Sequence, residues 1–207
     1  MRVYVYVDGF NLYYRALDKT PYRWLNVVEL AKRVLRPGDT IDLLRYFTAR
    51  ISPRGGDLGA PRRQQIYLSA LSTLPNVVIH YGRFLAKTKK RPLASNPSQF
   101  VEVLDSEEKG SDVNLASHLI NDGWRKRYEA ALVLSQDTDL IEPIRIARDE
   151  VNLPVGLVWL DGRQPQRELA DAASFVRHIS AADLRTSQFP NVIKRSTGKQ
   201  IIKPVEW

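Results

Sequence analysis

The sequence predicts an α/β protein, a three-layer α/β/α sandwich in which a mainly parallel central sheet lies between two layers of helices. Two observations support this fold class. Short apolar runs alternate along the chain with segments of helical periodicity, which is typical of layered α/β folds. The length of 207 residues also fits one domain. We expect the sandwich to occupy residues 1–180 and a short C-terminal extension to occupy residues 181–207.

The first half of the chain alternates strand patterns with helix patterns. Val3–Val7 is rich in β-branched and aromatic residues, which predicts a strand that ends at Asp8. Leu25–Leu35 has apolar residues at helical spacing and stops before Pro37, which predicts a helix. The following predicted elements are a strand, a helix and the start of a third strand: Ile41–Ile51, Ala60–Leu74 and Val77–Ile79.

The second half begins with a charged segment and then returns to the same alternation. Residues 83–109 lack a clear period, so we expect a hairpin or a loop insertion, with Phe100–Leu104 as a short strand. Ala130–Ser135 is almost continuously apolar, which predicts a strand buried on both faces. The remaining predictions are the helices Ser111–Asn121, Leu140–Glu150 and Ala181–Arg185, and the strands Val155–Leu160 and Ser174–His178.

The composition excludes several classes of protein and of site. The chain has no cysteine, which rules out disulfide frameworks, thiolate metal sites and cysteine nucleophiles. No apolar run approaches the length of a signal peptide or of a transmembrane helix. We therefore expect a cytoplasmic protein with no membrane partner, and the sequence leaves a homo-oligomer open.

The net charge of +8 suits a polyanionic partner, and its distribution is more informative than its total. One basic stretch has five positive charges within nine residues and no acid among them: Arg83, Lys87, Lys89, Lys90 and Arg91. Two further stretches lie around a Pro- and Gly-rich loop and in the C-terminal tail: Arg45, Arg50, Arg54, Arg62 and Arg63, and Lys194, Arg195, Lys199 and Lys203. Phosphate-binding surfaces and ordinary solvated faces both have this composition, so both interpretations stay open.

Polar and acidic residues follow the predicted strands at their carboxyl ends, where open parallel sheets form binding sites. They are Asp8 and Asn11 after the first strand, Asp112 at the start of a helix, and Ser135, Asp137 and Asp139 after the strand at 130–134. Mg²⁺ and Mn²⁺ take carboxylate ligands, and clustered carboxylates repel one another unless a cation lies between them. Asp and Asn at such positions are also common caps. Asp139 fits that role best, because a helix is expected to start there.

Three segments contain these candidate site residues: Val5–Leu12 (VYVDGFNL), Glu108–Ala116 (EKGSDVNLA) and Leu132–Leu140 (LVLSQDTDL). In this order they resemble the NYN domain, a branch of the PIN-like metal-dependent nucleases. The family pattern is an apolar strand followed by D-G-x-N, then K-G-x-D opening a helix, then an apolar strand closed by S-x-D-x-D. The resemblance covers roughly residues 1–180.

The resemblance implies a PIN-like sheet and a divalent-metal-dependent endoribonuclease that hydrolyses single-stranded or structured RNA with Mg²⁺ or Mn²⁺. By it, Asp8, Asp112 and Asp137 are metal-site carboxylates, Asn11 positions ligand or water, and Asp139 is a fourth acid or supports the others. We further expect Tyr13, Tyr14 and Trp24 to be candidates for stacking on unpaired bases. The expected contacts to substrate are Lys109, Ser135, Arg83, Lys87, Lys89, Lys90 and Arg91.

Other enzyme classes fit the motifs less well. A phosphatase with an aspartate nucleophile needs a second Asp where Phe10 stands, and a Toprim-like domain has Glu after its first strand. The glycine motifs of Rossmann dinucleotide sites and of P-loops are absent from the sequence. The main alternative is a PIN-like RNA-binding or regulatory module with weak or no catalytic activity.

Overall fold

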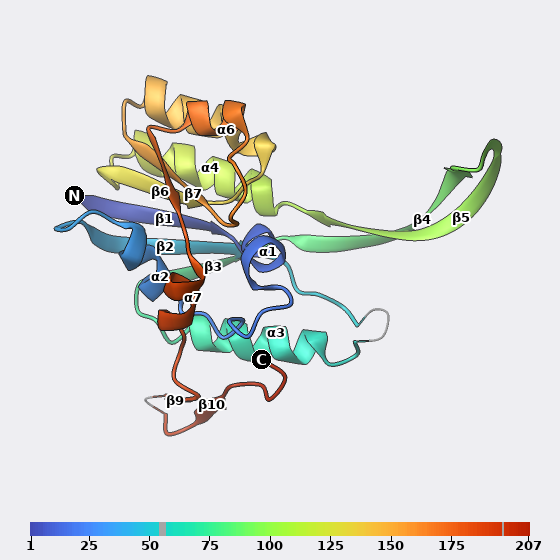
Figure 1. Ribbon diagram of the computed structural model, residues 1–207, viewed down its shortest axis with the longest axis horizontal. Coiled ribbons are helices and arrows are strands. Elements are labelled where there is room, and N and C mark those ends of the chain that lie inside the picture. Colours follow the sequence, from blue (N-terminus) through green and yellow to red (C-terminus); the bar gives the residue numbers. More distant parts are fainter. Residues whose placement is uncertain (54–56, 196) are drawn as a thin grey trace.

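Six parallel strands form the central sheet of the computed structural model, which describes residues 1–53, 57–195 and 197–207 (Figure 1). The strands are β1 (Arg2–Asp8), β2 (Thr40–Thr48), β3 (Val77–Tyr81), β6 (Ala130–Leu134), β7 (Val155–Trp159) and β8 (Phe175–His178). Their order across the sheet is β3-β2-β1-β6-β7-β8. Strands β2 and β3 are added on one side of β1, and β6, β7 and β8 are added on its other side. The switch point of this topology therefore lies between β1 and β6, where ligand sites of open α/β sheets form.

Helices cover both faces of the sheet and confirm the predicted three-layer sandwich. On one face lie α1 (Gly9–Leu12) with a π-helical turn η1 (Tyr13–Leu17), α2 (Val27–Val34), α3 (Ala60–Leu71) and α7 (Ala181–Thr186). On the other face lie α4 (Ser111–Trp124), a 3₁₀ turn η2 (Thr138–Leu140), α5 (Ile141–Arg145), a π-helical turn η3 (Ile146–Glu150) and α6 (Arg167–Ala172). Because side chains alternate along a strand, Val5 of β1 enters the first core and Tyr6 enters the second.

The predicted elements are present, with ends shifted by a few residues. The segment predicted as one helix, Leu140–Glu150, consists of a 3₁₀ start, α5 and η3. Helical turns directly after β1, the short α6, and the hairpin of β9 (Val192–Lys194) with β10 (Gln200–Ile202) were not predicted from the pattern. These pieces are too short to show a clear hydrophobic period.

Residues 83–109 form a long antiparallel hairpin, which we call the arm. Its strands are β4 (Arg83–Leu93) and β5 (Asn96–Lys109), and Figure 1 shows it extending far from the rest of the molecule. The hairpin interpretation of this segment is confirmed, and the expected strand Phe100–Leu104 lies within β5. At the root of the arm, the ring of Phe84 contacts that of Phe10 edge to face at 5.7 Å between centroids. The arm is therefore anchored next to α1.

The C-terminal extension packs against the body of the protein. Phe189 and Ile201 belong to the same core as β1, and the ring of Trp207 lies 5.7 Å from that of Tyr67. Trp24 is fully buried in this core, so it cannot stack on a bound base, in contrast to the exposed Tyr14. Within the described ranges, we find no helix with both the length and the apolar character needed to cross a bilayer.

The second basic stretch is not one continuous surface. The prediction that Arg45 belongs to it is wrong, because this side chain is buried and its guanidinium donates to the carboxylate of Asp122 at 2.7 and 3.1 Å. Arg63 forms an ion pair with Asp57. Arg54 lies outside the described residues. A charge that forms a buried ion pair contributes little to an exposed phosphate-binding face.

Candidate metal centre

Three carboxylates converge at the carboxyl edge of the sheet. Asp8 is the last residue of β1, Asp137 follows the neighbouring strand β6, and Asp112 lies in the first turn of α4. Each offers one oxygen, and these oxygens all lie within 4.8 Å of one another. The convergence expected from the three separate motifs is therefore present, at the switch point of the sheet.

The Asp8 carboxylate is buried, only 4% exposed, and both of its oxygens are held in place. Oδ1 accepts a hydrogen bond from the backbone N–H of Asn11 at 2.9 Å, and Oδ2 accepts one from the hydroxyl of Ser135 at 2.9 Å. The backbone after Asp8 packs closely against β2 because residue 9 is glycine: a Cβ on Gly9 would lie 2.7 Å from atoms of Phe47 and Tyr46. Burial raises the pKa of Asp8, and its hydrogen bonds oppose that rise.

The Asp137 carboxylate is oriented by the loop that follows β6. Its Oδ1 accepts from the backbone N–H of Asp139 at 3.0 Å, so Asp137 caps the helical turn η2. Its own N–H donates to the Ser135 hydroxyl at 3.1 Å, and the side-chain oxygen of Asn11 accepts from the N–H of Gln136 at 2.9 Å. Ser135 and Asn11 thus join the loop after β1 to the loop after β6.

These contacts bear on three of the expected roles. Ser135 is fully buried and its hydroxyl is engaged with Asp8 and Asp137, so it is a positioning residue rather than a contact to substrate. The side-chain oxygen of Asn11 accepts from backbone, and the expected role of Asn11 in positioning ligand or water stays a prediction for its NH₂ group. The expected cap at Asp139 is wrong: Asp137 is the cap, and Asp139 is exposed and outside the group of three. A capping carboxylate keeps further lone pairs, so capping and metal binding are compatible at Asp8 and Asp137.

The surroundings of Asp112 raise the pKa of its carboxyl group strongly. Burial, followed by the charges of Asp8, Asp137, Glu108 and Asp139, raises the pKa of Asp112 to about 6. Such crowding of acids favours either a proton or a divalent cation among them. The three oxygen donors fit Mg²⁺ or Mn²⁺, which prefer carboxylate ligands.

Glu108 supports the start of α4 and was not singled out in the sequence. One of its carboxylate oxygens accepts from the backbone N–H of Ser111 at 3.2 Å and from its hydroxyl at 2.8 Å. Gly110 takes a left-handed conformation (φ 101°) between them, which glycine adopts without strain. The available signal was the acid three residues before Ser111. This turn fixes the position from which Asp112 faces the other two acids.

We expect Asp112→Asn to stabilise the protein in EDTA. Because the folded-state pKa of Asp112 lies above its value in an unfolded chain, the folded state binds more protons, and stability falls as pH rises from about 4 to about 6. The variant cannot ionise at this position and avoids that loss of stability. The difference in Tm between the variant and the parent should therefore be larger at pH 7.5 than at pH 5. Added Mn²⁺ should raise the Tm of the parent and not that of the variant. Equal Tm values for both proteins in EDTA at pH 7.5 would contradict the crowding of charges.

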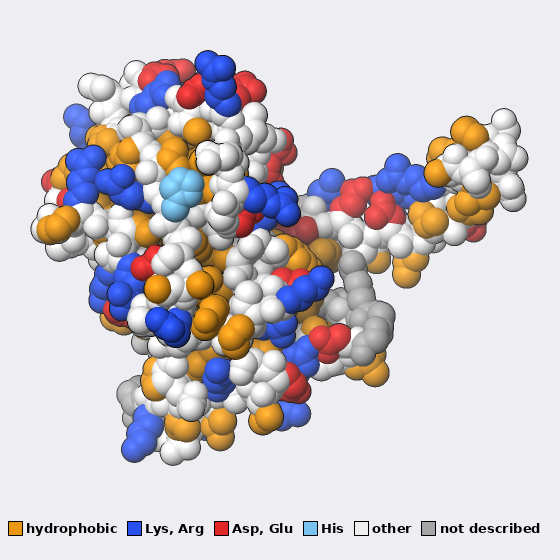
Figure 2. All heavy atoms as spheres, in the orientation of Figure 1, with side chains coloured by type: hydrophobic (Ala, Val, Ile, Leu, Met, Phe, Trp, Pro, Cys, Tyr) orange, Lys and Arg blue, Asp and Glu red, His pale blue; other side chains and the backbone are white. Residues whose placement is uncertain are grey.

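The predicted substrate-binding cations lie on the arm, and not all of them are available. Lys89 forms ion pairs with Asp105 and Glu107, Arg91 lies 3.5 Å from Asp105, and Lys109 lies 3.1 Å from Glu107. Among the ion pairs of the described residues, none involves Arg83, Lys87 or Lys90, and these three are exposed. Figure 2 shows basic and acidic side chains together along the arm and hydrophobic ones towards its tip.

Comparison with known proteins gives a distant relative and a similar fold. No family model matches the chain. The chain is 27% identical, over 239 residues, to the 6-hydroxy-3-succinoylpyridine 3-monooxygenase HspA of Pseudomonas putida (strain DSM 28022 / S16), covering 100% of this chain and 75% of that protein. A crystal structure of a protein of unknown function from Vibrio parahaemolyticus RIMD 2210633 superposes with a TM-score of 0.54 and 15% identity, over 87% of this chain and 93% of that one. This second likeness concerns the fold.

Proposed function

We propose that the protein is a divalent-metal-dependent ribonuclease that hydrolyses phosphodiester bonds of RNA at the centre formed by Asp8, Asp112 and Asp137. The observation that carries the proposal is the convergence of these carboxylates within 4.8 Å at the switch point of the sheet. The order of the three motifs, and their resemblance to the NYN domain, favours a nuclease over other enzymes that use carboxylate-held cations.

The residues of the centre are held so that a cation would meet a preformed site. Asp8 is fixed by Asn11 and Ser135, and Asp137 is fixed by the N–H of Asp139. A bound Mg²⁺ or Mn²⁺ supplies a Lewis acid for the phosphodiester and for the attacking water. Hydrolysis would join the water oxygen to phosphorus and break the bond from phosphorus to the 3′ oxygen, which leaves with a proton. The products would be a 5′-phosphate and a 3′-hydroxyl.

The direct test is cleavage of labelled RNA by the purified protein. Single-stranded RNA, structured RNA and DNA of the same sequence are incubated with Mn²⁺, Mg²⁺ or EDTA, and the ends of the products are identified. We expect cutting of RNA with either cation and none in EDTA. The Asp8→Asn protein, purified in the same way, controls for contaminating nuclease. Equal cutting by both proteins, or no cutting by the parent, would remove the proposal and favour the RNA-binding module without catalysis.

The arm is expected to bind the RNA backbone through its three unpaired cations. Replacing Arg83, Lys87 and Lys90 with Gln should weaken binding and flatten the log–log dependence of affinity on salt by about 2 units, since each contact to single-stranded RNA contributes about 0.7. Binding is measured in EDTA from about 50 to 200 mM salt. A variant with Gln at Lys194, Lys199 and Lys203 has the same change of charge in the C-terminal tail and should keep the slope of the parent. Equal slopes in all three proteins would contradict a role for the arm.

A second candidate function comes from the relative in Pseudomonas putida, which is named as a monooxygenase acting on a substituted pyridine. The observation that favours it is a pocket lined by aromatic side chains next to the turn that follows Asp8. In such a reaction, one atom of O₂ enters the ring and the other becomes water, with two electrons from a reduced nicotinamide or flavin. This activity would be established if the protein consumed O₂ only when both the electron donor and a hydroxypyridine with a succinoyl group were present. A rate unchanged when the pyridine is left out would exclude it.

A further inference from the structure

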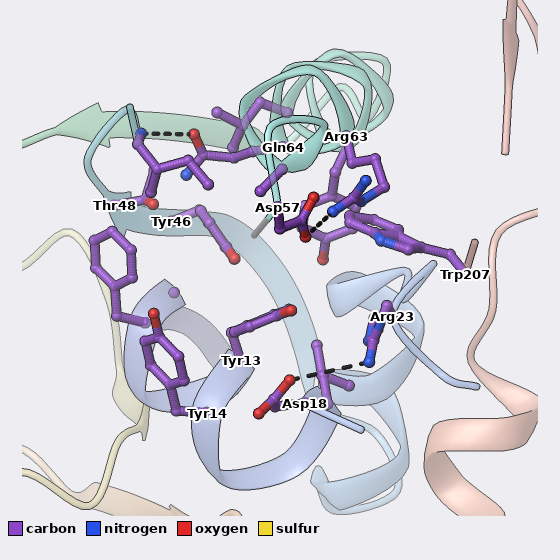
Figure 3. A pocket seen from close by; sticks show the side chains of 17 residues that line it. Tyr13, Tyr14, Asp18, Arg23, Tyr46, Thr48, Asp57, Arg63, Gln64 and Trp207 are labelled. Carbon is purple, nitrogen blue, oxygen red and sulfur yellow. Dashed lines mark hydrogen bonds and ion pairs between the residues drawn. The ribbon is translucent and has the colours of Figure 1, made fainter. Parts of the chain in front are cut away.

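A pocket of about 280 Å³ lies between the helical turns that follow β1 and the helix α3 (Figure 3). Its wall includes Tyr46 and Thr48 of β2, and Figure 3 shows the hydroxyl groups of Tyr46 and Tyr13 pointing towards its interior. Pockets for small ligands have volumes of about 300 to 1,000 Å³, so this pocket is slightly smaller than that range. It has room for one planar ring system with its nearest substituents.

The pocket lies at the same carboxyl edge of the sheet as the metal centre, although none of the three carboxylates lines it. Gly9, which lines it, directly follows Asp8 in the chain and packs against the Tyr46 ring. Burial, followed by the charge of Asp8, raises the pKa of the Tyr46 hydroxyl. Phe10, another lining residue, contacts Phe84 at the root of the arm. A group in this pocket would therefore lie against the turn that follows Asp8 and close to the root of the arm.

Aromatic rings make up much of the wall. Phe10 and Tyr14 are stacked at 6.5 Å between centroids, with an angle of 17° between their planes, and Tyr13 meets Tyr14 edge to face. Tyr14 is 67% exposed although its ring is largely apolar, so a face of it is open to a ligand. Every nucleobase has an aromatic face, and stacking on exposed aromatic side chains is the usual way that proteins bind unpaired bases.

The polar groups of the pocket suit a neutral ring with hydrogen-bonding edges. The lining includes two pairs of opposite charge, Arg63 with Asp57 and Arg23 with Asp18, so the charges cancel and donors stand beside acceptors. Among the described residues, the Nε of Arg23 is buried without a hydrogen-bond partner. A buried donor without a partner is costly, and an acceptor on a ligand would relieve that cost. A nucleobase provides both donors and acceptors on its edges and has no charge at neutral pH.

We propose that this pocket binds one unpaired nucleobase of the RNA strand, next to the phosphodiester at the metal centre. The inference rests on the proposed function for the identity of the strand. The same ring chemistry could come from a free nucleoside, and the experiment separates these two sources. The pocket would then determine which phosphodiester bond of an unpaired strand lies at the carboxylates.

The experiment measures binding in EDTA, so that it does not depend on cleavage. A short single-stranded RNA is compared with a series in which each base in turn is replaced by an abasic site. We expect one position to lose about tenfold in affinity with the parent, since stacking of one base supports a change of this size. Tyr14→Ala should lose a similar factor on the intact RNA and almost nothing further on the RNA with that abasic site. Tyr14→Phe keeps the ring and should restore binding.

Trp124→Ala is the matched control, because Trp124 is also an exposed aromatic residue but lies at the far end of α4 from Asp112. It should bind every RNA as the parent does. Equal loss at every abasic position, or an equal effect of Tyr14→Ala on intact and abasic RNA, would overturn the proposal. The proposal would also be overturned if a nucleoside (adenosine, guanosine, cytidine or uridine) bound the parent in a Tyr14-dependent manner without displacing RNA. The pocket would then bind a free ligand and not a base of the strand. Base-dependent binding by a protein that does not cleave RNA would contradict the proposed ribonuclease activity and support the base-binding pocket. Cleavage of RNA by a protein without base-dependent binding would support the ribonuclease activity and contradict the pocket.

Discussion

The Asp8→Asn protein is expected to cut RNA about 10³-fold more slowly than the parent while keeping its fold. The change removes one of three charges that would hold the cation, and a cation at a phosphoryl centre contributes several kcal/mol to stabilisation of the transition state. The amide that replaces the carboxylate keeps an oxygen for the N–H of Asn11, and its NH₂ group can donate to the Ser135 hydroxyl. The loops around the centre should therefore stay in place.

The rate is measured in single turnover, with the protein in saturating excess over the RNA and with saturating Mn²⁺, so that binding does not limit it. Asp139→Asn is the matched control, because it removes the same charge from an exposed residue of the same loop that lies outside the group of three. Its rate should stay within a few-fold of the parent. An Asp8→Asn protein as fast as Asp139→Asn would show that this centre does not carry the reaction.

The second large effect is expected at Asp122, where substitution by Asn should lower the free energy of unfolding by about 3–5 kcal/mol. Asp122 is 0% exposed and accepts from Arg45 Nε at 2.7 Å and from the Tyr6 hydroxyl at 3.0 Å. Without its charge, the Arg45 guanidinium would be buried and unpaired. For a chain of this length, we expect a fall in Tm of about 10 °C. Urea unfolding followed by circular dichroism gives the free energy.

A matched control and the dependence on pH sharpen this test. Asp105→Asn breaks an ion pair on the arm and should lower the free energy of unfolding far less than Asp122→Asn does, because the pair on the arm is in contact with solvent. Burial raises the pKa of Asp122, but Arg45, Tyr6 and Arg127 outweigh it, so the net pKa is below its usual value. The stabilisation is therefore present at neutral pH and is lost as pH falls through the folded-state pKa. If Asp122→Asn and Asp105→Asn lower the free energy of unfolding by the same amount at pH 7, the buried pair of Arg45 and Asp122 does not stabilise the fold more than the exposed pair does.

The sheet and the three acids could be predicted because the signals for them are local. Apolar runs such as 130–134 identify buried strands, and the rule that parallel strands end at one edge brings Asp8 and Asp137 together. The arm gave only a weak signal of this kind, at Phe100–Leu104. Its strands face solvent on both sides, so there is no core to impose the alternation of apolar and polar residues that identifies a half-buried strand.

The pairing of Arg45 with Asp122 could not be predicted for a different reason. The two residues are 77 positions apart, and the sequence does not show that β2 and α4 bring them into contact. Ser135 was assigned to the substrate because its hydroxyl follows a strand. Only the structure shows that this hydroxyl is directed inward to Asp8. Composition and spacing indicate which groups gather at an edge of the sheet, but not which of them face the solvent.

The root of the arm is continuous with two of the segments that carry acids of the metal centre. At this root β4 follows Gly82, β5 ends at Lys109 and Phe84 contacts Phe10. Gly82 and Gly110 pack closely there, since a Cβ on Gly110 would lie 3.8 Å from the Cα of Gly82. Strand β5 leads through Gly110 into the first turn of α4, which carries Asp112, and Phe84 contacts Phe10 in the turn that follows Asp8. A displacement of this root would therefore shift the two segments from which Asp8 and Asp112 project.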